Sequence, residues 1–315
     1  MHNTRPYPQH HEVGTAWPSD VDRPAGMRVP PNHTAGPPTS SWWPGVFAIG
    51  IRSISDCALG HLTNGAHPIR ELAWFDRVIN LLVGETVIAL VLPEVGDGPF
   101  HAIVPRLPLR SLSATWQLDA GGLHYGPWRL AITPITAVWN PSPNWAALCI
   151  SDNAMGSLRR VVSDTVVVRA EAGPGARYDA VIESGIARLL RAIVEGETAP
   201  LEAETQALAG LGPGLTPYGD DVLAGIILGL WAAHHPGCWK IGRRIAQAAA
   251  PNTNQLSRAF LDAASQGLAN ATWHRLLAAL SRADRHEIER AAHRVVATGA
   301  TSGAAMLRGF TAVST

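Results

Sequence analysis

A change of hydrophobic pattern near residue 172 constrains the fold more than any other feature of this sequence. Before it, apolar and β-branched residues come in short runs that glycine and proline interrupt, as in WFDRVINLLVGETVIALVLPEVGDGPFHAIV at residues 74–104. Such runs are typical of strands joined by tight turns. After it, alanine, leucine and arginine predominate. We therefore predict an α+β protein, with a β-rich domain at 43–172 and an all-helical domain at 173–315.

Apolar residues recur at helical spacing throughout the second part. The segments predicted to be helical are 181–193, 222–234, 241–249, 255–268, 272–280, 285–296 and 306–313. Strands and helices do not alternate along the chain, which disfavours a Rossmann-type sheet.

The first 42 residues form a separate region by composition. The first forty contain eight prolines and four histidines but almost no apolar run. So little apolar surface cannot offset the entropy of ordering the chain, so we predict a disordered proline-rich tail.

Charge and cysteine content limit which binding partners and which cellular compartment we expect. The 25 basic and 25 acidic residues balance, and Lys240 is the single lysine. We therefore expect no nucleic-acid partner and no P-loop lysine. The longest apolar run, 222–233, is too short to cross a bilayer, so we expect no membrane partner. The three cysteines, Cys57, Cys149 and Cys238, have no CxxC spacing and predict free thiols in a cytoplasmic protein.

The stretch GLGPGLTPYGDD at residues 210–221 stands directly before the most apolar segment. Thr216 followed by Pro217 predicts a helix start, with Thr216 as N-cap and Pro217 as the first helical residue. Asp220 and Asp221 then lie in the first turns, where the helix dipole favours the ionised carboxylate. On this register Asp221 points inward and Asp220 lies nearer the mouth of the loop. A capped helix start would explain all of this without a ligand.

The number of glycines favours a binding site as well. A helix start needs one cap and one glycine, whereas four glycines here leave bare backbone that a ligand can approach. The candidate catalytic residues are Asp220 and Asp221. The candidate ligand-binding residues are Gly212, Gly214, Thr216, Gly219, Asn254, Ser257, Ser302 and Gly303. For Asn254, N-capping of the next helix is an equally good explanation.

A second glycine segment resembles the first. SGAAMLRGF at residues 302–310 repeats the pattern of YGDDVLAGI at 218–226, with Ala304 and Ala305 in place of the two aspartates. We expect the two glycine turns to face each other. Gly225 and Gly229, four residues apart on one helix face, are expected to allow close helix packing.

GLGPGLTPYGDDVLAG closely resembles the signature of a bacterial family that includes AllH, a subunit of the oxamate carbamoyltransferase of anaerobic allantoin breakdown, a route of purine catabolism. FDRVINLL, PEVGDGP, TNQLSRAFLDAASQG and GATSGAAMLRG also resemble this family, so the similarity extends from about residue 50 to the C-terminus. The family's C-terminal motif often reads GHTSGxD. Here Ala300 and Ala305 stand in place of its histidine and aspartate.

The resemblance implies a cytoplasmic enzyme subunit that is active only with its partners, an acyl-CoA-synthetase-like subunit and a third companion. The implied reaction converts the small-molecule substrate oxalurate, with phosphate, to oxamate and carbamoyl phosphate. Two other functions stay open. One is a non-catalytic assembly subunit whose glycines only permit packing. The other is a hydrolase that uses the aspartate pair with magnesium, although the sequence leaves the cofactor and any metal ligand unassigned. His234 and His235 are expected to end a helix rather than to bind a metal.

Overall fold

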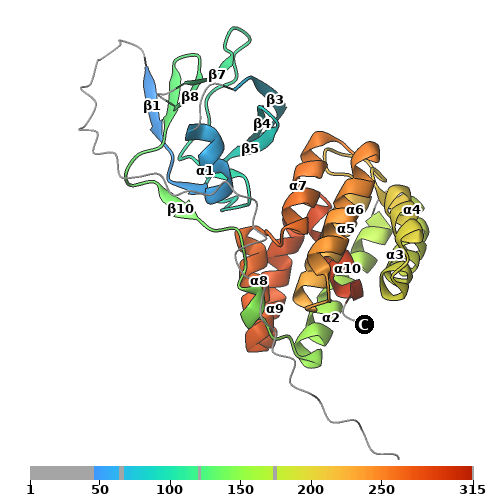
Figure 1. Ribbon diagram of the computed structural model, residues 1–315. Helices are drawn as coiled ribbons and strands as arrows, with labels where there is room; N and C mark the ends of the chain where they lie inside the picture. Colours follow the sequence, from blue (N-terminus) through green and yellow to red (C-terminus); the bar gives the residue numbers. More distant parts are fainter. Residues whose placement is uncertain (1–45, 64–66, 120–121, 173–175, 314–315) are drawn as a thin grey trace, which may run out of the picture. The chain divides into compact units, whose positions relative to one another are not determined.

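Strands fill the region from residue 47 to 139 and helices predominate from residue 152 onward (Figure 1). The computed structural model describes residues 46–63, 67–119, 122–172 and 176–313. The predicted α+β class is confirmed. The tail predicted at 1–42 lies outside the described residues. Residues 44–315 cluster as one compact unit, and their division into a β-rich and a helical domain stays a prediction.

The strands form two sheets. The order in the four-stranded sheet is β1 (Phe47–Gly50), β9 (Trp128–Ala131), β8 (Gly122–Tyr125) and β7 (Trp116–Asp119). The order in the six-stranded sheet is β10 (Ala137–Trp139), β2 (Ser53–Ser55), β6 (His101–Ile103), β5 (Thr86–Val91), β4 (Val78–Val83) and β3 (Ile69–Trp74). Helix α1 (Asp56–Thr63) follows β2. Gly84, with a φ of 61°, makes the two-residue turn of the β4–β5 hairpin.

Alternation along β5 shows how this sheet is used on both faces. Ile88 and Leu90 belong to the core that both sheets share, whereas Val87, Ala89 and Val91 belong to a second cluster that includes Leu256 and Ala263 of helix α7. Successive side chains of a strand point to opposite faces, so a nearly continuous apolar run fits a strand covered on both sides. This strand therefore packs against the part of the chain that carries the glycine-rich turn.

Each of the seven segments predicted to be helical coincides with a helix, although 222–234 and 255–268 extend two and three residues past the helix end. The helices of this part are α2 (Asp152–Ala172), α3 (Ala176–Glu195), α4 (Thr198–Leu208), α5 (Tyr218–Ala232), α6 (Cys238–Ala249), α7 (Gln255–Ser265), α8 (Ala271–Arg282), α9 (Arg285–Val296) and α10 (Ser302–Val313). Helices α2 and α4 were not predicted, and the helices begin well before residue 173. None of the described helices combines the length and apolar character that crossing a membrane requires.

Helix α5 is the central helix of the group. Thirteen of its fifteen residues are buried. An almost wholly apolar helix of this kind must be surrounded by protein, and α10 provides its most extensive contact. The first residues of α5 and α10 form the candidate site.

Candidate functional site

The loop before α5 is built on glycines with left-handed backbone. Gly210, Gly212 and Gly214 have φ angles of 73°, 106° and 108°. A side chain would be strained at each of these positions. A Cβ at Gly210 would also meet the carbonyl oxygen of Asn252, whereas the nearest atom to a Cβ at Gly214 is 4.0 Å away. Open space beside the backbone is therefore found at Gly214.

Gly219 and Gly303 have a different role from the loop glycines. A Cβ at Gly219 would meet the carbonyl oxygen of Leu208, and one at Gly303 would meet that of Val295. Each glycine lets the start of its helix pack on the end of the helix before it. At these two candidate ligand-binding positions, protein backbone therefore occupies the space where a side chain would begin.

The two glycine segments are related by their contacts as well as by their sequences. A Cβ at Gly225 would meet the carbonyl oxygen of Met306, and one at Gly309 would meet that of Val222. The two contacts are reciprocal, because Gly225 corresponds to Gly309 and Val222 to Met306 in the sequence repeat. The hydroxyl oxygens of Thr216 and Ser302 lie 2.9 Å apart. The structure therefore brings the two turns together, and the expected close packing through Gly225 is confirmed.

The helix start differs by one residue from the prediction. Helix α5 begins at Tyr218, Pro217 is its N-cap with a φ of −52° and a ψ of 145°, and no side chain caps it. Thr216 is not the N-cap, because its hydroxyl bonds to Ser302 across the two turns. The predicted register is wrong here because the competing hydroxyl comes from a segment 86 residues away.

Asp220 is buried and fully engaged. Its exposure is 3%. The backbone N–H of Gly210 donates to Oδ1 (2.8 Å), and the hydroxyl of Thr253 donates to Oδ2. The expectation that Asp220 lies at the loop mouth is therefore wrong. Its carboxylate joins the beginning of the loop to the segment before α7.

Asp221 is also buried, but it is incompletely paired. Its exposure is 6%, and Oδ2 has no hydrogen-bond partner among the described residues. Burial raises the pKa of Asp221 from 3.8 to about 8; the charge of Asp220 also raises it, while hydrogen bonds from Ser302 and Thr216 oppose the rise. The expected ionised carboxylate is therefore wrong for Asp221, because desolvation outweighs the helix dipole. Near pH 7 this carboxyl group can donate a hydrogen bond.

Asn254 caps α7 and also contacts the glycine-rich loop, while its role as a ligand-binding residue stays a prediction. Its Oδ1 accepts hydrogen bonds from the backbone N–H groups of Leu256 (3.0 Å) and Ser257 (3.1 Å), which caps α7. Its Nδ2 donates to the carbonyl oxygen of Leu215 in the loop (2.8 Å). Ser257 is 1% exposed, and its hydroxyl has no partner in the part of the chain that the structure describes. Asn254 thus holds the loop, while no loop contact of the Ser257 hydroxyl is present.

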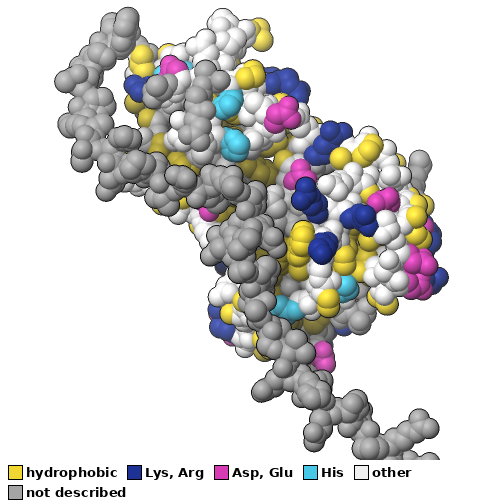
Figure 2. Space-filling model, viewed as in Figure 1, with side chains coloured by type: hydrophobic (Ala, Val, Ile, Leu, Met, Phe, Trp, Pro, Cys, Tyr) yellow, Lys and Arg dark blue, Asp and Glu magenta, His cyan; other side chains and the backbone are white. Residues whose placement is uncertain are grey.

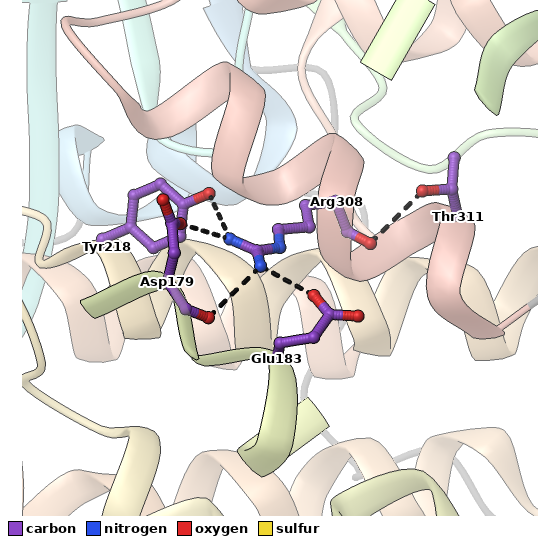
Figure 3. Close-up of polar contacts among 5 residues, drawn as sticks. All are labelled: Asp179, Glu183, Tyr218, Arg308 and Thr311. Atoms are coloured by element: carbon purple, nitrogen blue, oxygen red, sulfur yellow. Dashed lines mark hydrogen bonds and ion pairs between the residues drawn. The ribbon is translucent and has the colours of Figure 1, made fainter. Parts of the chain in front are cut away.

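Arg308 was not predicted from the sequence, although it lies in the second glycine segment. Its guanidinium contacts Asp179 (2.8 Å) and Glu183 (2.7 Å) of α3 and the hydroxyl of Tyr218 (3.4 Å) (Figure 3). Burial lowers the pKa of Arg308, but hydrogen bonds to Tyr218, Glu183 and Asp179 outweigh it and raise the pKa overall. Arg308 therefore connects α10 to the first residue of α5. The sequence feature that could have identified Arg308 is its place as the one charged residue in an otherwise apolar and small-residue helix.

A metal centre is not formed by the residues described. No group of three or more His, Cys, Asp or Glu side chains among them could hold a metal ion. Both oxygens of Asp220 already accept hydrogen bonds. His234 and His235 follow the end of α5, and Nε2 of His234 lies 2.8 Å from the carbonyl oxygen of Leu148.

The family model of AllH, described as oxamate carbamoyltransferase subunit AllH, matches residues 208–314. This confirms the AllH-like resemblance. The match covers about a third of the chain and includes the loop, α5, Asn254 and the start of α10. The similarity proposed for the β-rich part lies outside it and stays a prediction. No curated protein and no solved structure shows a significant match.

The engagement of Asp220 leads to a prediction for the AllH-like region. We expect Asp220→Ala to lower the free energy of unfolding by about 1–3 kcal/mol, because two donors lose a buried acceptor. Thr253→Val should lower the free energy of unfolding by less. The double variant should lower it by less than the sum of the two single losses, with a coupling energy of at least about 0.5 kcal/mol. Urea unfolding of the four proteins measures this coupling. Strictly additive losses would mean that the Thr253–Asp220 contact does not stabilise the loop.

Proposed function

We propose that the chain is a subunit of a carbamoyl-transferring complex, and that it binds a small ligand with a carbonyl or phosphate group where the loop meets the start of α10. The observation that carries this proposal is the carboxyl group of Asp221, which is buried with one oxygen unpaired beside the hydroxyls of Thr216 and Ser302. A buried polar atom without a partner costs about 1–3 kcal/mol. A ligand that pairs with it would recover this energy.

The electrostatics of the site suit an anion or a carbonyl oxygen. The N-termini of α5 and α10 come together at the Thr216–Ser302 contact, so the positive ends of both helix dipoles lie there. An ionised Asp221 would repel an anion, but the raised pKa keeps this carboxyl group protonated near pH 7. Residues 213–215 of the loop are exposed, which gives a ligand a route to the site by movement of the glycine-rich segment.

The similarity to AllH supports a specific reaction. A phosphate oxygen would attack the carbamoyl carbon of oxalurate, the C–N bond would break, and the nitrogen of the departing oxamate would take up a proton. Among the described residues of the site, the protonated Asp221 is the candidate proton donor, whereas Asp220 holds the loop. Ala300 and Ala305 supply no reactive group, so further groups would come from the partners, an acyl-CoA-synthetase-like subunit and a third companion. Such a complex would work in the cytoplasm.

Calorimetric titration tests the binding site. The protein, alone and with its companion subunits, is titrated with oxamate, oxalurate, carbamoyl phosphate and phosphate, with and without magnesium. We expect at least one of these ligands to bind, and Thr216→Val and Ser302→Ala each to weaken its binding three- to tenfold through a lost hydrogen bond. Ser113→Ala, which removes an exposed hydroxyl in the β-rich part, is the control and should change nothing. No binding of any ligand, even with the companions present, would rule out the site.

One other function is favoured by an observation. The second glycine turn carries Ala304 and Ala305, and the closest contacts of Gly225, Gly303 and Gly309 are with protein backbone. These features suit a non-catalytic assembly subunit. The double variant Asp220→Ala, Asp221→Ala separates the two functions. A folded variant that assembles but lacks activity supports the binding site, whereas unchanged activity at a lower melting temperature supports assembly alone.

A further inference from the structure

A groove of about 420 Å³ lies away from the glycine-rich loop, between the end of α3, the start of α4 and the outer face of α6. Its size falls in the range of small-molecule sites. The buried side chains of Ile193 and Leu201 contribute an apolar floor, and Lys240, Arg243 and Arg244 line it from α6. Figure 2 shows Lys and Arg side chains gathered over the helices that Figure 1 labels α6 and α7. The groove is therefore both apolar and cationic.

Two of the three cations are available to a ligand. Arg244 is engaged, since it donates to the hydroxyl of Thr198 (2.7 Å) and pairs with Glu202 (3.3 Å). The side chains of Lys240 and Arg243 are exposed and make no hydrogen bond or ion pair with the described residues, although the charge of Arg243 acts on Asp262. One acidic residue, Glu197, lines the groove, so the lining has a net positive charge.

The start of α4 adds a second, independent reason to expect an anion. Glu197 is the N-cap of α4, and its side chain makes no capping hydrogen bond. Arg244 is held at this helix start by Thr198. The free N–H groups of a helix start and a neighbouring guanidinium both attract an anion. The helix start and Arg244 therefore point to the same place for a phosphate group.

An aromatic surface lies one to two helical turns from this place. Trp239 lines the groove and is 49% exposed, and Nζ of Lys240 lies 5.2 Å from its ring centre. Trp239 precedes Arg244 by five residues, which is about 7.5 Å along the axis of α6. A half-exposed tryptophan beside an apolar floor offers a planar ring a surface on which to stack.

We propose that this groove binds an organic phosphate that carries a planar ring, which is the chemistry of a nucleotide. The phosphate lies between the start of α4 and the cations Lys240, Arg243 and Arg244, and the ring lies against Trp239. This site is separate from the one proposed at the glycine-rich loop, and neither depends on the other.

Titration of the full chain at low salt with ADP, adenosine and pyrophosphate tests the proposal. We expect ADP to bind at least tenfold more tightly than adenosine or pyrophosphate, because it uses both halves of the groove. Trp239→Ala should weaken the binding of ADP about tenfold and leave the binding of pyrophosphate unchanged. The double variant Lys240→Ala, Arg243→Ala should weaken the binding of both ADP and pyrophosphate. The double variant Arg285→Ala, Arg290→Ala, which removes two exposed arginines of α9, is the matched control and should bind ADP like the wild type.

Several results would overturn the proposal. One is no ADP binding to the wild type. Another is ADP binding no tighter than pyrophosphate, which would indicate charge attraction without the ring. A third is an equal loss in the Lys240→Ala, Arg243→Ala variant and in the Arg285→Ala, Arg290→Ala variant, which would indicate attraction to the overall charge.

Discussion

Alanine at Gly225 is expected to destabilise the protein by about 1–3 kcal/mol or more. The added Cβ would overlap the carbonyl oxygen of Met306, which is backbone and cannot rotate away as a side chain can. Helices α5 and α10 would have to separate, and overpacking of a close core contact costs about 1–3 kcal/mol or more. Gly309→Ala should cost a similar amount, because its Cβ would meet the carbonyl oxygen of Val222. Urea unfolding at neutral pH measures both losses.

Gly156 provides the matched control for these variants. It lies within α2 with no atom within 4 Å of an added Cβ. Gly156→Ala should therefore be neutral or should stabilise the protein by up to about 1 kcal/mol, because alanine favours the helix. A loss below about 1 kcal/mol for Gly225→Ala would mean that α5 and α10 are not packed as closely as described.

Replacement of Asp221 by asparagine should change how stability depends on pH. The pKa of Asp221 is raised to about 8 in the folded protein, from a usual 3.8. Between these values the folded state holds a proton that the unfolded state has released, so wild-type stability falls as pH rises toward 8. The slope is about 1.4 kcal/mol per pH unit. Asparagine does not titrate and resembles the protonated carboxyl group in shape.

The Asp221→Asn variant should therefore gain about 3 kcal/mol relative to wild type between pH 5 and pH 7.5. Urea unfolding of both proteins across this range gives the difference. The comparison of the two proteins at each pH cancels the contributions of titrating groups that do not interact with Asp221. A difference that does not change with pH would mean that Asp221 is ionised in the folded protein, and the proton donor proposed at the site would be lost.

The sequence allowed the fold class, the β-rich character of the first part and most helices to be predicted, because these depend on local periodicity. Gly225 could be assigned to helix packing for the same reason, since residues four apart lie on one helix face. Helix α2 was missed because apolar and β-branched runs suit a strand as well as a helix. Helix α4 was missed because Pro200 stands in its first turn and because only three buried residues provide its packing face.

The hydrogen bonds, burial and ionisation of the site residues could not be predicted from local sequence. The cap position of Thr216 and the ionisation of Asp221 depend on Ser302, and the burial of Asp220 depends on Thr253. These partners are 33 to 86 residues away along the chain. The role of Arg308 likewise depends on Asp179 and Glu183 of α3. Such contacts exist only once the helices have packed.

A crystal structure of the protein grown with oxamate near pH 7 tests the central claim most directly. We expect oxamate density at the junction of the loop and α10, with an oxamate oxygen within hydrogen-bond distance of Oδ2 of Asp221 and of the hydroxyl of Ser302 or Thr216. An empty junction, with the Thr216–Ser302 hydrogen bond intact in protein that calorimetry shows to bind oxamate, would contradict the account and place the ligand elsewhere.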